Sequence, residues 1–149
     1  AEMLARGVFE GKYLNDCEGE FPAEWYRAAR AAGKLRPGGA DPRVNEFGVK
    51  SRKSLGYWRK KGWIPIAAGD RDVRGWFQWY CRYWMGRRMP AVDAVQIKRW
   101  RAFRRHAGQI LASYRRMGAG ERPRTKAEKR RHRPRQRQAL LQWAYDPYV

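Results

Sequence analysis

The chain has 149 residues, a formal net charge of +20 and a hydrophobic fraction of 43%. A chain of this length and apolar content can bury a core, which excludes a wholly disordered polybasic protein. Arginine outnumbers lysine, and because a guanidinium binds phosphate through two hydrogen bonds and stacks on bases, the charge favours a nucleic-acid partner. No apolar run reaches the length of a membrane span and no secretory signal is recognisable, so we expect an intracellular protein, in the cytoplasm and nucleoid or in the nucleus.

The first third of the chain predicts one clear helix. Residues 1–24 carry six acids against two cations, so the remainder of the chain holds all of the positive excess. Pro22 opens a helix over residues 23–32 that ends at Gly33, because proline fits the first turn of a helix and glycine fits its end. The proline and glycine content of residues 36–42 then predicts a loop.

Residues 45–66 combine turn residues, apolar residues and cations. Ser51 is placed to cap a helix that ends at Gly62, with Trp58 inside it. The segment resembles the helix-turn-helix start of excisionase-like and mercury-regulator-like DNA-binding domains, at Gly48-Val49, Ser51, Leu55, Trp58, Gly62 and Ile64-Pro65. This resemblance implies that the start of the helix faces the major groove of duplex DNA and that its end contacts phosphate, through Ser51, Arg52 and Lys53 and through Arg59, Lys60 and Lys61 respectively. The alternative is an ordinary capped basic helix.

Six aromatic residues lie within residues 76–84, just before the paired Arg87 and Arg88. Helical spacing places Trp76, Trp79, Tyr80 and Tyr83 on one face, with Asp70 and Asp72 as candidate caps and Gly86 as the end. We expect most of these rings to fill the core. Cys81 falls opposite the aromatic face beside Arg82, where an accessible thiol would be reactive and a buried thiol would be structural. Trp63 and Trp84 lie at the margins of their helices, and we expect both rings to be exposed and to stack on bases.

Pro90 opens the longest predicted element, a helix that reaches about Met117. Its apolar and ring-bearing residues recur every three or four positions and predict a core-facing seam of Gln96, Trp100, Phe103, Ala107, Ile110, Tyr114 and Met117. The opposite face carries four cations without an acid among them, and we expect these to contact phosphate: Lys98, Arg101, Arg105 and Arg116.

The region after this helix is strongly basic. Residues 115–137 hold eleven Lys or Arg and one large apolar residue, so residues 119–133 are predicted to be a flexible basic arm. Residues 134–149 form a last helix, opened by Pro134, that packs back on an aromatic-rich helical core over residues 1–118. The arm and this helix would add phosphate contacts from Arg130, Arg131, Arg133, Arg135 and Arg137. The expected fold is mainly α, a compact single domain of about five helices with the basic arm.

Sites for catalysis and metal binding are sparse in the sequence. Two histidines and two cysteines form no ligand cluster, so we expect no metal and no cofactor. The best interpretation is a nucleic-acid-binding protein that prefers duplex DNA over RNA. One alternative is a base-modifying or base-excision enzyme with an aromatic pocket, whose acid would come from Glu10, Asp16, Glu18, Glu24 or Asp93. Another is a structural protein that packs nucleic acid or belongs to a ribosome.

Overall fold

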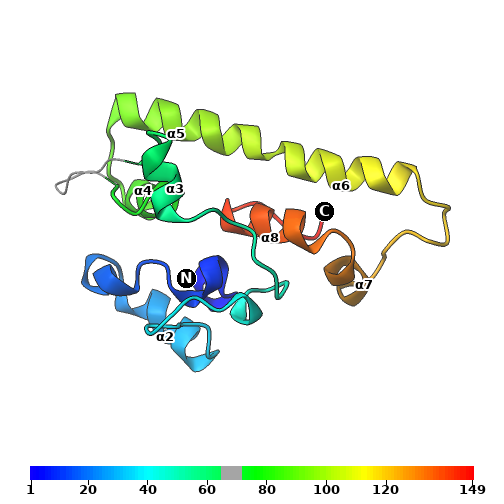
Figure 1. Ribbon diagram of the computed structural model, residues 1–149, viewed down its shortest axis with the longest axis horizontal. Coiled ribbons are helices and arrows are strands. Elements are labelled where there is room, and N and C mark those ends of the chain that lie inside the picture. Colours follow the sequence, from blue (N-terminus) through cyan, green and yellow to red (C-terminus); the bar gives the residue numbers. More distant parts are fainter. Residues whose placement is uncertain (65–71) are drawn as a thin grey trace. The chain divides into compact units, whose positions relative to one another are not determined.

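The computed structural model describes residues 1–64 and 72–149, and these residues are mainly α-helical (Figure 1). Helices account for 57% of the structure and the described residues contain no strand, which confirms the predicted fold class. Within the described ranges, no helix combines the length and the apolar character that a membrane span needs. Contacts divide the chain into two compact units, unit 1 (Ala1–Ser51 and Ala102–Val149) and unit 2 (Arg52–Arg101). Pro65 and the candidate cap Asp70 lie outside the described residues.

Unit 1 is built from both ends of the chain. Its helices are α1 (Glu2–Ala5), the 3-10 turns η1 (Val8–Gly11), η2 (Asn15–Glu20) and η3 (Pro42–Val44), α2 (Ala23–Ala31), α6 (Arg105–Arg115), α7 (Lys126–Arg131) and α8 (Pro134–Gln142). Helix α2 begins after Pro22 and ends before Gly33, as predicted, and Gly33 has a positive φ of 64°. Helix α1 packs on α2, while α8 packs on α6, on α7 and on η1. The core is formed by apolar side chains that include Leu14, Tyr26, Ile110 and Leu140.

Buried amide side chains of α8 join the two parts of unit 1. The Gln142 Oε1 atom accepts the Phe9 N–H at 3.3 Å, and its Nε2 donates to the Ser51 carbonyl at 2.8 Å. The Gln138 Oε1 atom accepts the Phe47 N–H at 3.2 Å. Both glutamines are buried, so these bonds satisfy backbone groups that have no partner in a regular helix or sheet. Helix α8 therefore holds the irregular N-terminal segment through backbone hydrogen bonds as well as through apolar contact.

Two glycines allow this N-terminal segment to pack closely. Gly7 has a φ of 69°, and a Cβ atom there would lie 2.0 Å from the Val44 carbonyl oxygen. Gly11 has a φ of 72°, and its Cβ atom would lie 2.4 Å from the Lys34 carbonyl oxygen. Both the backbone conformation and the space require glycine at these positions.

Helix α7 corrects the prediction of an arm without structure. The Thr125 hydroxyl accepts the Glu128 N–H, and the Glu128 carboxylate accepts the Thr125 N–H at 3.1 Å, so the two residues form a capping box. Lys129 donates to the Tyr148 carbonyl at 2.5 Å, so the helix is attached to the C-terminal segment. The composition of residues 119–133 misled the prediction because the order here comes from capping and from bonds to distant backbone groups, which do not need large apolar side chains.

Unit 2 contains α3 (Leu55–Lys60), α4 (Trp76–Trp84) and residues 90–101 of α5 (Pro90–Phe103). The predicted aromatic helix is confirmed as α4, and it ends before Gly86, whose φ is 103°. Trp76 and Trp79 are buried, as expected, but so are Gln78 and Cys81 on the opposite face. Helix α4 is therefore covered on both sides.

The long predicted helix is interrupted once. Helix α5 ends at Phe103 and α6 starts at Arg105, with a turn at Arg104 between them. The predicted seam is partly retained, since Gln96 and Ile110 are buried. Phe103 stacks on Trp143 with ring centroids 4.0 Å apart and planes 10° apart.

Candidate nucleic-acid interface

The positive charge of the chain lies outside its first third. Residues 1–51 contain eight cations and eight acids, so they are formally neutral. Residues 52–101 contain thirteen Lys or Arg against three Asp, and residues 102–149 contain thirteen against three acids. The net charge of +20 is therefore divided equally between unit 2 and the second part of unit 1.

Both acids that the structure describes in unit 2 are buried. Asp72 accepts hydrogen bonds from Arg82 at 3.1 Å and from Arg87 at 2.7 Å, and its side chain is 5% exposed. Asp93 accepts the Trp79 Nε1–H at 2.8 Å and the Met89 N–H at 2.7 Å. Asp72 was predicted to cap α4, but the helix starts after Gly75 and the Asp72 carboxylate binds two arginines instead.

The exposed charges in the described part of unit 2 are consequently all positive. They are Lys53, Arg59, Lys60, Lys61, Arg88, Lys98 and Arg101. All seven were predicted as contacts to nucleic acid. Arg52 and Arg87, which were also predicted to contact nucleic acid, are half-buried. The Arg87 guanidinium forms an ion pair with Asp72. A surface whose described exposed charges are all positive attracts polyanions.

Helix α3 is shorter than predicted and starts later. Its cap is Ser54, whose hydroxyl accepts the Tyr57 N–H at 3.1 Å. Ser51 instead donates to the Arg135 carbonyl at 2.6 Å within unit 1. Residues 51–53 are therefore not helical, and of the positions that the resemblance assigns to DNA only Arg59, Lys60 and Lys61 belong to the helix or its C-cap.

Trp63 is exposed, as expected, but its ring already has partners. Gly62 has a φ of 68°, and the Trp63 N–H donates to the Trp58 carbonyl at 2.9 Å across the end of α3. This helix ending brings the Trp63 ring onto Trp58, with centroids 4.8 Å apart. The Arg99 guanidinium lies 4.3 Å from the Trp63 ring, and burial lowers the pKa of Arg99. Trp63 therefore links α3 to α5.

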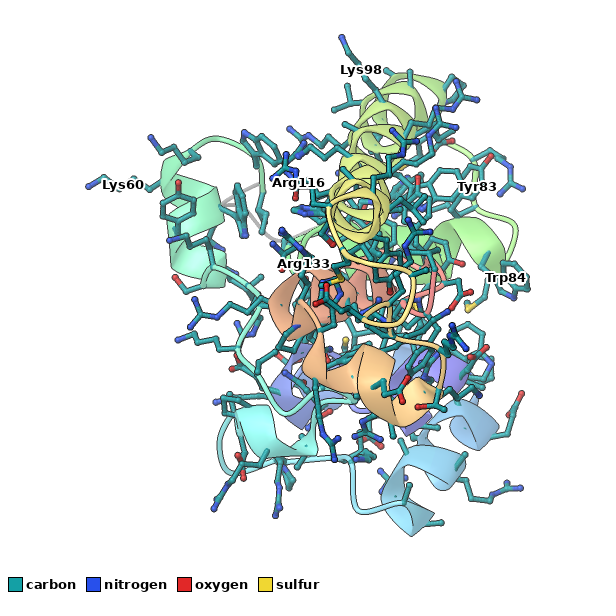
Figure 2. The ribbon with its side chains drawn as sticks, turned by 90° about the vertical axis from the view of Figure 1, so that its right-hand side faces the viewer. Lys60, Tyr83, Trp84, Lys98, Arg116 and Arg133 are labelled. Carbon is teal, nitrogen blue, oxygen red and sulfur yellow. The ribbon has the colours of Figure 1, made fainter. Side chains whose placement is uncertain are left out.

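Trp84 differs from Trp63 in both exposure and contacts. Its side chain is 72% exposed, against 42% for Trp63. It makes no hydrogen bond or ring contact with the part of the chain that the structure describes. Figure 2 shows Trp84 projecting at the end of α4, on the opposite side of the view from Lys60 of α3. The two predicted stacking residues therefore differ: the Trp63 ring lies against Trp58 and Arg99, whereas Trp84 projects from the end of α4.

The cations predicted on the long helix are exposed in both units. Lys98 and Arg101 belong to α5 in unit 2, and Arg105 and Arg116 belong to unit 1. Figure 2 shows Lys98 pointing outward from its helix. The exposure of all four agrees with a surface role, and their contact with phosphate stays a prediction.

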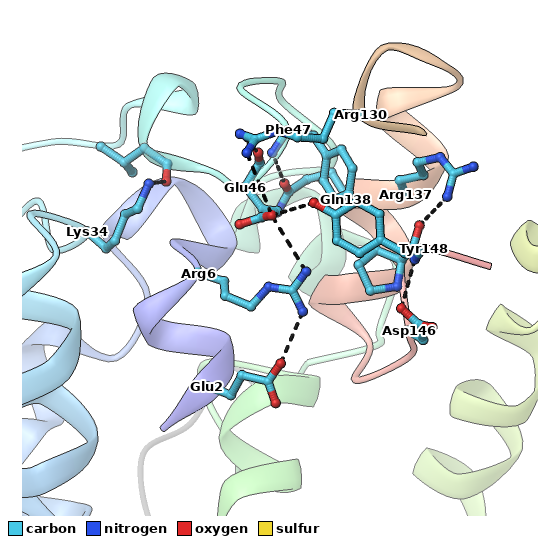
Figure 3. A network of polar contacts seen from close by, with 12 residues as sticks. Glu2, Arg6, Lys34, Glu46, Phe47, Arg130, Arg137, Gln138, Asp146 and Tyr148 are labelled. Carbon is cyan, nitrogen blue, oxygen red and sulfur yellow. Dashed lines mark hydrogen bonds and ion pairs between the residues drawn. The ribbon is translucent and has the colours of Figure 1, made fainter. Parts of the chain in front are cut away.

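The basic residues of α7 and α8 are not equivalent. Arg131 and Arg135 are exposed, and Arg133 is half-buried. Arg130 donates to the Glu46 carbonyl at 2.5 Å, and Figure 3 shows its guanidinium beside Glu46.

Arg137 was predicted as a phosphate contact, and the structure contradicts this. Its side chain is fully buried, and it donates to the carbonyls of His132, Pro147 and Val149 and to the hydroxyl of Tyr114. Burial lowers its pKa. Arg137 holds the C-terminal segment against α6 and α8.

Two of the acids proposed for catalysis, and the thiol, are buried, whereas Asp16 and Glu24 are exposed. Asp93 joins α4 to α5, and Glu10 is buried in η1 with its N–H bound to the Asn45 side chain at 2.7 Å. Cys81 is buried, so the accessible thiol is not present. Among residues 1–64 and 72–149, no three His, Cys, Asp or Glu side chains lie close enough together to hold a metal ion.

No protein-family model, curated protein or solved structure matches this chain. The candidate interface therefore rests on the charges and contacts of this chain alone. Two of its features escaped the sequence analysis: the Asp72 pair with two arginines, and the Arg99–Trp63 contact. Both join residues that are ten or more positions apart, and no local pattern indicates such partners.

Proposed function

We propose that this protein binds nucleic acid, with duplex DNA as the preferred form, through phosphate contacts made by the exposed cations of unit 2. One observation supports this most strongly. Both described acids of the unit, Asp72 and Asp93, are buried and hydrogen-bonded, so none of its described carboxylates faces the solvent to repel phosphate. A surface evolved only for solubility would carry both signs of charge.

The N-terminal segment of the same chain provides the comparison. Its cations are balanced one for one by acids, and ion pairs form at its surface between Arg6 and Glu2, at 3.1 Å, and between Arg43 and Asp41, at 2.9 Å. Mixed charges therefore occur in another part of the same chain. The separation of charge in unit 2 is a local property and supports a specific role for that unit.

Unit 1 carries exposed cations of its own. Arg116, Arg131 and Arg135 are exposed on α6, α7 and α8 or at their ends. The acids beside them serve the backbone: Glu121 accepts the Gly118 N–H at 3.0 Å, and Glu128 accepts the Arg124 N–H at 2.7 Å. These carboxylates thus accept backbone N–H groups at a helix start and in a turn. The neighbouring exposed arginines are available to contact phosphate.

Duplex DNA is proposed over RNA on the resemblance of residues 45–66 to DNA-binding helix-turn-helix domains, of which Arg59, Lys60 and Lys61 remain on the surface. Such a partner places the protein inside the cell, in the cytoplasm and nucleoid or in the nucleus. The proposal is tested by fluorescence anisotropy with a short labelled duplex DNA, the same sequence as an RNA duplex, and each single strand. We expect the DNA duplex to bind most tightly.

A competitor without bases provides the control. Polyglutamate carries negative charge but no phosphate and no rings, and it should displace the duplex only at much higher charge concentration. If polyglutamate displaces the duplex at an equal concentration of negative charge, the binding is only non-specific electrostatic attraction and the proposal is refuted. Stronger binding of the RNA duplex would move the assignment to RNA. A parallel incubation with duplexes that carry damaged bases, analysed for strand or base release, tests the enzymatic alternative.

A further inference from the structure

Trp84 is the most exposed large apolar side chain among the described residues, and Met85 beside it is 48% exposed. An indole that contacts solvent over most of its surface is unfavourable for the free protein. Exposed together at the end of a helix, the two side chains form an apolar protrusion and not a pocket. Figure 2 shows the protrusion leaving the ribbon at the end of α4.

The backbone beneath Trp84 is held firmly. The chain turns at Gly86, where the Gly86 N–H donates to the Tyr83 carbonyl at 3.1 Å and the Arg87 N–H donates to the Arg82 carbonyl at 3.0 Å. This pattern closes the end of a helix with a glycine of positive φ. The side chains of Arg82 and Arg87 then both bind the buried Asp72. Residues 83–88, which we name the 83–88 turn, are therefore fixed from the interior side.

One exposed cation lies close to Trp84 in the chain. Arg88 is exposed, lies 4.0 Å from the Tyr83 ring centroid and donates to the Tyr83 carbonyl at 2.6 Å. With no exposed acid in the described part of unit 2, the Arg88 charge would repel a basic partner and attract an anionic one. Flat apolar rings next to negative charge are the chemistry of stacked bases between phosphates.

Resting on the proposed function, we infer that Trp84 inserts between adjacent base pairs of a DNA duplex and opens that step, while Arg88 contacts the flanking phosphate. Apolar side chains wedge into duplexes in this way, at the cost of unstacking. The cost is smallest where stacking is already broken, so the protein prefers a duplex with a mismatch or a missing base over an intact duplex. Trp63 does not share this role, because its ring contacts Trp58 and Arg99.

The test uses the full chain and duplexes with 2-aminopurine, a base whose fluorescence rises when it is unstacked, beside a mismatch or in an intact step. We expect the wild-type chain to raise this fluorescence and to prefer the mismatch. Trp84→Ala should abolish the rise and lower affinity about 5- to 150-fold, the range that one stacked aromatic ring provides. It should leave the dependence of affinity on salt unchanged, since no phosphate contact is lost. Trp84→Phe should retain part of both effects.

Leu111→Ala is the matched control, because Leu111 is a 46% exposed apolar residue on α6 in unit 1. It should behave as wild type. Salt-sensitive binding that Trp84→Ala leaves intact, with no fluorescence change, would overturn the wedge and preserve the proposed function. Absence of duplex binding by the wild-type chain would overturn both. A dimer of the free chain that Trp84→Ala dissociates would show that the protrusion is covered by a second copy and would also overturn the inference.

Discussion

Removing three exposed lysines from unit 2 should weaken binding in a manner that depends on salt. Lys53, Lys60 and Lys61 are exposed, and their ammonium groups make no hydrogen bond or ion pair with the described part of the chain. The Lys53 ammonium lies 5.5 Å from the Tyr57 ring centroid. Their replacement by Gln changes the net charge by three without disturbing the core. The matched control replaces Lys12, Arg27 and Lys50, three exposed cations outside unit 2, and changes the net charge equally.

The magnitude follows from counterion release. Each phosphate contact contributes about 0.9 to the slope of the logarithm of affinity against the logarithm of salt concentration, so three contacts contribute roughly 2.7. Because this contribution vanishes near 1 M salt, the loss at about 0.1 M salt should be roughly 500-fold. The wild-type chain, with about six to ten contacts, should itself lose three to five decades of affinity between about 50 and 200 mM salt.

The assay is an anisotropy titration of one labelled duplex at several salt concentrations, with thermal melting of each variant. Exposed substitutions should change the unfolding free energy by less than about 0.5 kcal/mol. If the two triple variants lose the same affinity and slope, the long-range charge of the chain drives binding and unit 2 holds no interface. A wild-type affinity that is constant over this salt range would refute the electrostatic argument altogether.

Three further predictions concern stability. Arg137→Gln should lower the unfolding free energy by at least about 3 kcal/mol in a melting experiment, because several buried acceptors lose their charged donor. Arg135→Gln, two residues away and exposed, should change the unfolding free energy by less than about 0.5 kcal/mol. Equal effects of the two substitutions would contradict the structural role of Arg137. Phe103→Ala should cost about 2–4 kcal/mol, less than for a fully buried Phe, because it removes the stack on Trp143, and an unchanged melting temperature would show that the stack contributes nothing. Hydrogen bonds from the backbone N–H groups of Arg124 and Thr125 lower the pKa of Glu128, so these bonds stabilise α7 fully above the usual carboxyl pKa, and the stabilisation is lost as pH falls through the lower pKa of the folded state. Amide hydrogen exchange in α7 should therefore accelerate as pH falls through that range. Glu128→Gln should remove this dependence of exchange on pH.

Local signals in the sequence predicted the C-terminal ends of three helices. Glycines with positive φ end α2, α3 and α4 where expected, and the exposure of Trp84 follows from its place at the end of α4. These features depend on residues within one or two turns of each other, which a sequence displays directly.

Features that depend on distant partners were not predictable. Asp72 had the position of a helix cap, but two arginines ten and fifteen residues away bind its carboxylate more strongly. Arg137 had the composition of a basic surface, but the carbonyls of the C-terminal segment surround it. Charge alone therefore included the buried Arg137 among the phosphate contacts, and the exposed members of the predicted interface stay a prediction.

The discontinuity of unit 1 has a consequence for synthesis on the ribosome. The N–H groups of Phe9 and Phe47 donate to side chains of α8 that lie 133 and 91 residues later in the chain. These N–H groups therefore emerge from the ribosome without their acceptors and acquire them only after α8 has been synthesised. Unit 2 is continuous and lies entirely within this interval. Its folding can be complete before α8 is made. The basic, aromatic unit would therefore be able to engage a polyanion on the nascent chain before the rest of the protein closes around its own C-terminal helix.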